Sequence, residues 1–247
     1  MFELHIDGPV ARLRLSKPET RNAIPLSGWA KLGDRAEEAG SAGAQVLILS
    51  GIPGGAFCSG ADISDFDAFA DPGARTAFRL AIRSGLDRLR AGIPSIAVVE
   101  GACYGAGVAV AMACDIRFAG ADAQFAITPA KLGISYPQED VHRLVSLVGA
   151  GQAARLLLGA QSIGGEEAER IGLVERFLPA SVDEEVESNA RAIAANDPES
   201  LRTLKRGLAL ASSGVPSDAQ QDRSFEALLG SDALIQRLAA YRSRPRR

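Results

Sequence analysis

Two short apolar runs, residues 46–49 and 96–99, constrain the fold of this chain more than any other feature. Each run consists mainly of Val, Ile, Leu and Ala, which is typical of strands buried on both faces of a parallel sheet. Each run is followed by a segment of small residues and then by a helical pattern, and strands that alternate with helices predict an α/β fold. From residue 183 onward the pattern is helical. We therefore expect an α/β core with a helical C-terminal part.

The flanking segments extend this pattern. Residues 4–15 alternate apolar and polar side chains around the Asp7-Gly8 turn, which predicts a β-hairpin. Pro25 is suited to the first turn of a helix that continues towards Glu38. The remaining elements that we expect are a helix over 78–89, a buried helix in the later half of 101–114, strands over 115–118, 124–127 and 172–177, and helical breaks at 197–198 and 214–216.

Composition excludes several classes of protein. A net charge of −3 argues against a nucleic-acid partner, which would require a basic surface, and the one basic cluster, residues 242–247, is expected to be solvated. The most apolar stretch, residues 102–114, is too short to span a bilayer, so we expect no membrane partner. The N-terminus has no signal-peptide pattern, and the three cysteines form no C-x-x-C pair. We therefore expect a cytoplasmic protein with free thiols and without a metal site.

Two segments, residues 56–63 and 100–107, share a physical form: a buried strand ends in a turn of small residues that opens a helix. Gly and Ala let a ligand approach the backbone closely, and the first N–H groups of a helix have no helical acceptor. Two such donors that converge on one oxygen would form an oxyanion hole. The alternatives are simple turn formation, and a nucleotide-binding loop, which is disfavoured because Val110 stands where G-x-G-x-x-G requires its third glycine.

An ordered set of motifs makes the chain resemble the enoyl-CoA hydratase/isomerase (crotonase) superfamily over nearly its whole length. The matching segments are 22–23, 57–63, 105–107, 114–116, 132–133, 143–144, Lys205 and 241–245. The resemblance implies a ββα superhelix over residues 1–190 and a helical trimerisation region over residues 191–247. It also implies a homotrimer or a hexamer of paired trimers. The ligand would be an acyl-CoA thioester, with coenzyme A entering as part of the substrate and no separate cofactor.

The resemblance also assigns site residues. The backbone N–H groups of Ala61 and Ala106 would form the oxyanion hole that stabilises a thioester enolate. The residues that would lie along the coenzyme A moiety are Arg21, Ser59, Gly60, Ala61, Asp62, Ile63 and Gly105. Arg21 would face the phosphates, although a solvated surface arginine is an equally good interpretation.

The chain departs from the family at two positions. Hydratases of this family use two glutamates to position water and to exchange its proton with the substrate. The matching positions here are Ala109 and Pro129, and neither side chain can carry a proton. Hydration by paired glutamates is therefore not expected.

Substitute acid/base groups lie in the segment 135–140. We rank Glu139 first, then Asp140, then Tyr136. The string 128–136 is similar in part to methylmalonyl-CoA decarboxylases, which have a tyrosine at the place of Tyr136. The alternative for Glu139 and Asp140 is capping of a helix over 141–147, a common use of acidic residues.

Three functional hypotheses remain open. The first is an enzyme of hydratase/isomerase type that uses Glu139 or Asp140. The second is an acyl-CoA decarboxylase, in which loss of CO₂ generates the enolate without a strong base. The third is a catalytically silent acyl-CoA-binding subunit, because a fold does not by itself determine a function.

Overall fold

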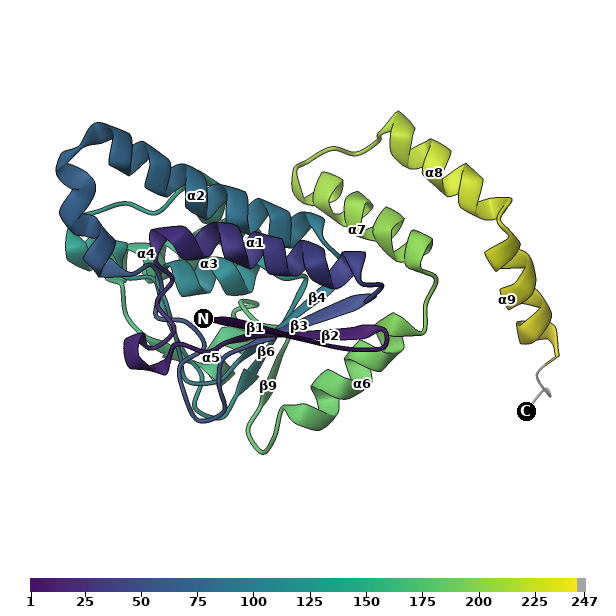
Figure 1. The fold of residues 1–247 in the computed structure, drawn as a ribbon, viewed down its shortest axis with the longest axis horizontal. Coiled ribbons are helices and arrows are strands. Elements are labelled where there is room, and N and C mark those ends of the chain that lie inside the picture. The colour runs from purple at the N-terminus through teal and green to yellow at the C-terminus, as the bar shows by residue number, and fades with distance from the viewer. Residues whose placement is uncertain (244–247) are drawn as a thin grey trace. The chain divides into compact units, whose positions relative to one another are not determined.

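The chain forms two compact units, residues 1–193 and a second unit that starts at Ala194. The computed structural model describes residues 1–243, so the end of the basic cluster, from Arg244, lies outside the described residues. The predicted α/β architecture with a helical C-terminal part is confirmed (Figure 1).

A six-stranded sheet forms the centre of the first unit. Its strands follow the order β1 (Phe2–Asp7), β2 (Val10–Leu15), β3 (Val46–Ser50), β4 (Ser95–Val99), β6 (Ile116–Gly120) and β9 (Arg176–Leu178). The hairpin β1–β2 is antiparallel, as predicted, and every later pairing in this sheet is parallel. The apolar runs 46–49 and 96–99 thus form the two central strands, β3 and β4, which explains why they contain few polar residues.

A second, three-stranded sheet carries the site. It consists of β5 (Ala102–Tyr104), β7 (Gln124–Ala126) and β8 (Ile163–Gly164), in the order β5-β7-β8. Strand β5 is parallel to β7 and leads directly into helix α3 (Ala106–Ala113), whose residues from Gly107 to Ala113 are all buried. We had predicted the buried helix but had not predicted strand β5.

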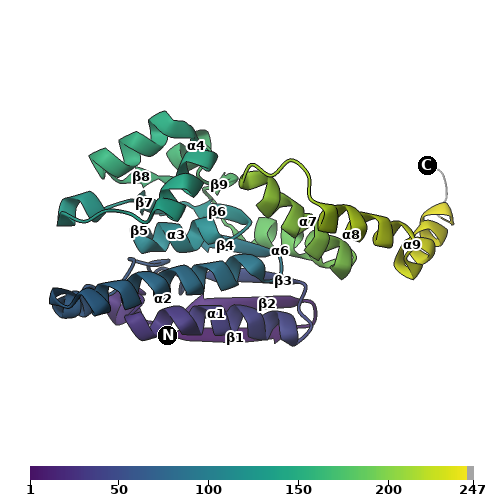
Figure 2. The same cartoon turned by 90° about the horizontal axis from the view of Figure 1, so that it is seen from above.

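Helices α1 (Leu26–Ser41) and α2 (Pro72–Ala91) run side by side, α1 packs on β1 and β2, and α2 also packs on α3 (Figures 1 and 2). Helix α2 starts before the expected 78–89 because Asp71 accepts hydrogen bonds from the N–H groups of Gly73 and Ala74, with Pro72 in the first turn.

The remaining elements of the first unit are short turns of 3-10 helix and three further α-helices. They are η1 (Pro18–Thr20), η2 (Ile63–Ala70), η3 (Pro129–Leu132), α4 (Gln138–Gly159), α5 (Gly165–Arg170) and α6 (Asp183–Ala194). The prediction of a strand over 172–177 was wrong for its first residues. Gly172 has φ +82°, a turn conformation, and strand β9 begins only at Arg176.

The second unit contains α7 (Pro198–Ser212), α8 (Ala219–Leu229) and α9 (Asp232–Arg242). Its helical breaks fall where Asp197-Pro198 and the segment 214–216 predicted them. Helices α7 and α8 are joined by an ion pair of 2.8 Å between Arg206 and Asp218 and by a hydrogen bond of 2.8 Å from Gln221 to the Thr203 carbonyl.

Candidate functional site

The two small-residue turns lie side by side because the strands that lead into them are paired. Cys58 forms a parallel bridge with Cys103, with the Cys58 N–H donating to the Ala102 carbonyl and the Tyr104 N–H donating to the Cys58 carbonyl. Ala61 and Ala106 each lie three residues beyond this bridge. Parallel strands run in register, so the same number of residues carries both chains to the same end of the pairing.

The two turns approach each other closely because glycine stands at positions 60 and 107. A Cβ atom built on Gly60 would lie 3.2 Å from the Ala106 nitrogen and 2.9 Å from the Tyr104 oxygen, and Gly60 has φ +107°. Since Gly60 and Ala61 are joined by one peptide bond, standard bond lengths put the Ala61 and Ala106 nitrogens within about 7 Å of each other. A Cβ on Gly107 would lie only 2.1 Å from the Cys58 oxygen, so neither glycine tolerates a side chain without movement of the backbone.

The N–H groups of Ala61 and Ala106 make no hydrogen bond within residues 1–243. Ala106 is the first residue of α3, so its N–H has no helical acceptor. Beside Ala61, the Ile24 backbone bonds to the neighbouring Gly60 carbonyl and Asp62 N–H. Successive N–H groups of an extended chain point to opposite sides, so the Ala61 N–H points away from Ile24. The two turns therefore each present one backbone N–H donor, at Ala61 and at Ala106, that has no partner within the described residues.

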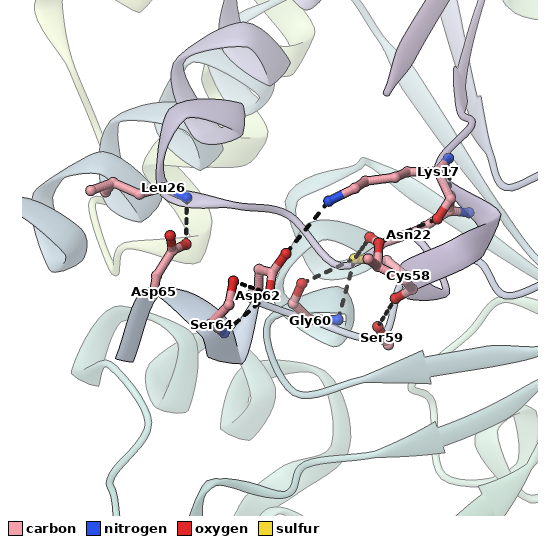
Figure 3. Close-up of polar contacts among 10 residues, drawn as sticks. Lys17, Asn22, Leu26, Cys58, Ser59, Gly60, Asp62, Ser64 and Asp65 are labelled. Carbon is pink, nitrogen blue, oxygen red and sulfur yellow. Dashed lines mark hydrogen bonds and ion pairs between the residues drawn. The ribbon is translucent and has the colours of Figure 1, made fainter. Parts of the chain in front are cut away.

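A loop from the N-terminal hairpin fixes the first turn (Figure 3). The buried Asn22 side chain donates to the carbonyl of Ala56 at 2.6 Å and accepts from the Lys17 N–H at 2.7 Å. Asn22 has φ +59°, a conformation that asparagine tolerates better than most residues. The sequence motif that contains Asn22 was recognised, but its role in holding this turn was not predicted.

Two of the residues assigned to coenzyme A, Ser59 and Asp62, make hydrogen bonds or ion pairs with the loop over residues 17–22 (Figure 3). The Ser59 hydroxyl donates to the Thr20 carbonyl at 3.1 Å, and Asp62 pairs with Lys17 at 3.5 Å. Hydrogen bonds from Ser64, with the charge of Lys17 as a smaller effect, lower the pKa of the Asp62 carboxyl. Arg21 is exposed, and its carbonyl accepts from the Ser59 N–H at 3.0 Å.

A cavity of about 420 Å³ opens beside the two turns. Its backbone wall includes Ala61 and Ala106, and η2, α2 and the segment 128–137 supply most of the other side chains. Its large apolar residues are Ile63, Phe66, Phe78, Ile82, Leu132 and Ile134. Phe66 and Phe78 pack edge to face with ring centroids 5.7 Å apart. The cavity can hold an apolar chain whose polar end meets the two N–H groups.

The structure places the predicted residues in two groups. Those that line the cavity are Ser59, Gly60, Ala61, Ile63, Gly105, Ala106, Tyr136 and Asp140. Arg21, Asp62 and Glu139 are not among its lining residues. Of the two positions that the sequence analysis matched to glutamates of the family, Pro129 lines the cavity and Ala109 is buried in α3.

Asp140 is the carboxylate of the cavity wall. It lies in the first turn of α4, is only 3% exposed, and is 3.6 Å from the guanidinium of Arg90. Burial raises the pKa of Asp140 to about 6, against the opposing effect of Arg90 and Arg143. Burial also lowers the pKa of Arg143 to about 10. A carboxylate with these properties is ionised at neutral pH yet basic enough to exchange a proton.

Glu139, the first-ranked acid/base candidate, has a different environment. Its side chain is 44% exposed and pairs with Arg83 at 3.1 Å. It lines an adjoining hollow of about 20 Å³, next to Arg83 and Asp87, which shares Asp140 with the cavity. Neither acid is the N-cap residue, since α4 begins after Pro137 without a side-chain cap, but both lie in its first turn, where negative charge favours the helix dipole. Glu139 and Asp140 are adjacent on a helix and so point in directions about 100° apart.

Tyr136 is buried beside Asp140. Its hydroxyl donates to the Gly105 carbonyl at 3.1 Å. Burial, and then the charge of Asp140, raise the pKa of Tyr136 well above its usual value, so the phenol is protonated. The hydroxyl proton is thus directed at the backbone of the second turn.

Burial also raises the pKa of the Cys58 thiol to about 12, and the three cysteines are buried. Within residues 1–243, no group of three or more His, Cys, Asp or Glu side chains is arranged to hold a metal ion. No helix in the described part of the chain has both the length and the apolar character needed to cross a bilayer.

Comparison with known proteins identifies the family. The sequence model of the enoyl-CoA hydratase/isomerase family matches residues 5–232. A family member from Hyphomonas neptunium superposes with a TM-score of 0.93 at 33% identity, covering 100% of this chain and 96% of that one. The chain is 31% identical to the short-chain-enoyl-CoA hydratase of Clostridium acetobutylicum, over 90% of this chain and 85% of the relative. It is 30% identical to the peroxisomal Delta(3,5)-Delta(2,4)-dienoyl-CoA isomerase of Arabidopsis thaliana, over 81% of this chain and 77% of the relative.

The chain belongs to the enoyl-CoA hydratase/isomerase family. The predicted crotonase-like fold and the predicted superfamily are confirmed. The family acts on acyl-CoA substrates, and its relatives include both a hydratase and an isomerase.

Proposed function

We propose that this protein moves a carbon–carbon double bond in an enoyl-CoA thioester through an enolate. The N–H groups of Ala61 and Ala106 hold the thioester oxygen, and Asp140 is the acid/base. The observation that carries the proposal is the position of Asp140, a buried carboxylate with a raised pKa on the wall of the cavity that the two N–H groups also line.

A single carboxylate is sufficient for this reaction. Asp140 takes a proton from the α-carbon of a 3-enoyl thioester, and the electron pair of that C–H bond passes into a dienolate whose oxygen faces the two N–H groups. The same proton then returns to the γ-carbon, which leaves the 2-enoyl thioester and an ionised Asp140. No water or oxidant is consumed. Hydration, in contrast, requires a group that positions water as well, and Ala109 and Pro129 provide none.

A panel of thioesters tests the proposal. Purified protein is given 3-hexenoyl-CoA, crotonyl-CoA and a malonyl-type CoA ester. We expect isomerisation of the first, with Asp140→Asn lowering turnover roughly 100-fold or more, the usual scale for an acid/base group. Glu139→Gln is the matched control and is expected to retain turnover, because that side chain is exposed and paired with Arg83. Rapid crotonyl-CoA hydration would contradict the proposal.

The two other hypotheses predict distinct results in the same panel. Turnover of the malonyl-type ester alone would favour the decarboxylase. Binding of all three thioesters without turnover would favour the silent subunit.

We also propose that the protein assembles as a homotrimer or as a hexamer of paired trimers. The support is a set of large apolar side chains in the second unit that are exposed in the single chain: Leu204, Leu208, Phe225, Leu229, Ile235 and Tyr241. Surfaces of this kind in a lone chain mark contacts with other chains. Light scattering that gives the 25.8 kDa mass of one chain would overturn this proposal.

A further inference from the structure

The direction of the Ala106 N–H depends on what holds the preceding carbonyl. The Gly105 carbonyl and the Ala106 N–H belong to one planar, trans peptide unit, so the two groups point in opposite directions. Whatever fixes the Gly105 carbonyl therefore aims the Ala106 donor. Gly105 has φ +51° and ψ −120°, so its conformation is one that a side chain would strain.

The Tyr136 hydroxyl occupies a specific position in the first turn of α3. It donates to the Gly105 carbonyl at 3.1 Å. In a regular α-helix the Ala109 N–H would bond to the Gly105 carbonyl itself. That bond does not occur in the described structure. The Gly105 carbonyl instead accepts from the Val108 N–H, three residues on, at 3.0 Å. The Gly105 carbonyl thus accepts from both the Tyr136 hydroxyl and the Val108 N–H.

The turn at residues 56–63, which carries the Ala61 N–H, is held differently. The Gly60 carbonyl, which shares a peptide unit with the Ala61 N–H, accepts from the Ile24 backbone N–H at 2.8 Å. One donor of the proposed oxyanion hole is therefore aimed by backbone pairing alone, and the other by the Val108 backbone N–H together with the Tyr136 hydroxyl. Only the direction of the Ala106 N–H can be altered by replacing a side-chain hydroxyl.

We propose that Tyr136 is a positioning residue that aims the Ala106 N–H at the thioester oxygen by holding the Gly105 carbonyl. This inference rests on the proposed oxyanion hole, and it assigns Tyr136 no proton transfer. Without the hydroxyl, the Gly105 carbonyl keeps only its bond from the Val108 N–H, and the Gly105–Ala106 peptide is free to tilt. Burial raises the pKa of the phenol well above its usual value, so the hydroxyl is a donor at neutral pH.

The test uses a readout that does not require turnover. Butanoyl-CoA labelled with ¹³C at its thioester carbonyl is bound to wild type and to Tyr136→Phe, and the infrared stretch of the labelled carbonyl is recorded. Hydrogen bonds polarise the C=O bond and lower its frequency, so we expect a lowering in wild type and the loss of at least half of it in Tyr136→Phe. Tyr104→Phe is the matched control, because its hydroxyl, one residue from Gly105, makes no hydrogen bond within the described residues.

Kinetics with 3-hexenoyl-CoA provide a second readout. We expect Tyr136→Phe to lower kcat about 10- to 100-fold, less than complete loss of one oxyanion donor, while KM changes by less than threefold. The acidic limb of the pH profile should keep its position, because Asp140 remains the base. An unchanged carbonyl frequency with a lowered melting temperature would overturn the inference in favour of packing alone. A shifted pH profile would overturn it in favour of Tyr136 as a proton donor.

The carbonyl measurement separates this inference from the proposed function. If wild type lowers the carbonyl frequency but isomerises nothing, the proposed reaction fails and the positioning role is still measured by the variant. If wild type does not lower the frequency, the oxyanion hole and the role of Tyr136 fail together.

Discussion

Replacing Asp140 by asparagine should change how the stability of the protein depends on pH. The pKa of Asp140 is raised from 3.8 to about 6 in the folded chain, chiefly by burial. Between these values the folded state binds more protons than the unfolded state, so stability falls as pH rises. Each pKa unit corresponds to about 1.4 kcal/mol, which gives a loss of about 3 kcal/mol over the whole titration and about 2 kcal/mol between pH 4 and pH 7. The amide side chain of the variant does not titrate, so the variant escapes this loss.

Urea unfolding of both proteins at several pH values, at one fixed protein concentration, measures the effect. We expect the free energy of unfolding of Asp140→Asn, minus that of wild type, to increase by about 2 kcal/mol from pH 4 to pH 7. Glu139→Gln is the control, because an exposed ion pair contributes at most about 1 kcal/mol. A difference that is flat or that decreases with pH would refute the raised pKa, and with it the choice of Asp140 as the base.

Three further predictions concern the backbone and the core. Gly107→Ala should destabilise the protein by roughly 3 kcal/mol or more in urea unfolding, because its Cβ would lie 2.1 Å from the Cys58 oxygen. The control, Gly151→Ala, should be neutral or stabilising, because a Cβ at this position of α4 would meet open space. Ala106→Pro should keep thioester affinity within a few-fold by calorimetry while lowering turnover about 100- to 1000-fold, since proline fits the first position of a helix but has no N–H. Retained turnover would exclude Ala106 as a donor. Arg117→Met should destabilise by about 3–5 kcal/mol, because the buried guanidinium bonds to the Cys114 and Leu173 carbonyls and pairs with Glu175; a change below about 1 kcal/mol would contradict this.

The local sequence predicted the elements whose identity depends on neighbouring residues. The apolar runs that form β3 and β4, the hairpin, and the turn at residues 105–107 are all encoded by residues adjacent in the chain. The pairing of Cys58 with Cys103 is not, because it depends on how two distant strands meet. The proximity of Ala61 and Ala106 was predicted only from the resemblance to the family.

The choice between Glu139 and Asp140 could not be made from sequence. The two residues are neighbours in the first turn of α4, and a helix directs them to different sides. Which side faces the cavity is set by the packing of α2, which brings Arg90 to Asp140 and Arg83 to Glu139. The sequence of α2 does not by itself indicate where α4 packs. The role of Asn22 was missed for the same reason, since its hydrogen-bond partner at Ala56 is 34 residues away.

Deuterium exchange at the α-carbon of butanoyl-CoA in D₂O would show formation of the enolate itself, because it requires an enolate and a base but no particular acyl reaction. We expect wild type to incorporate deuterium at this carbon, detected by mass spectrometry, well above the rate in buffer. Asp140→Asn and Ala106→Pro should each lower that rate about 100-fold or more while Glu139→Gln retains it. Exchange at the buffer rate in wild type, with butanoyl-CoA bound, would contradict the account.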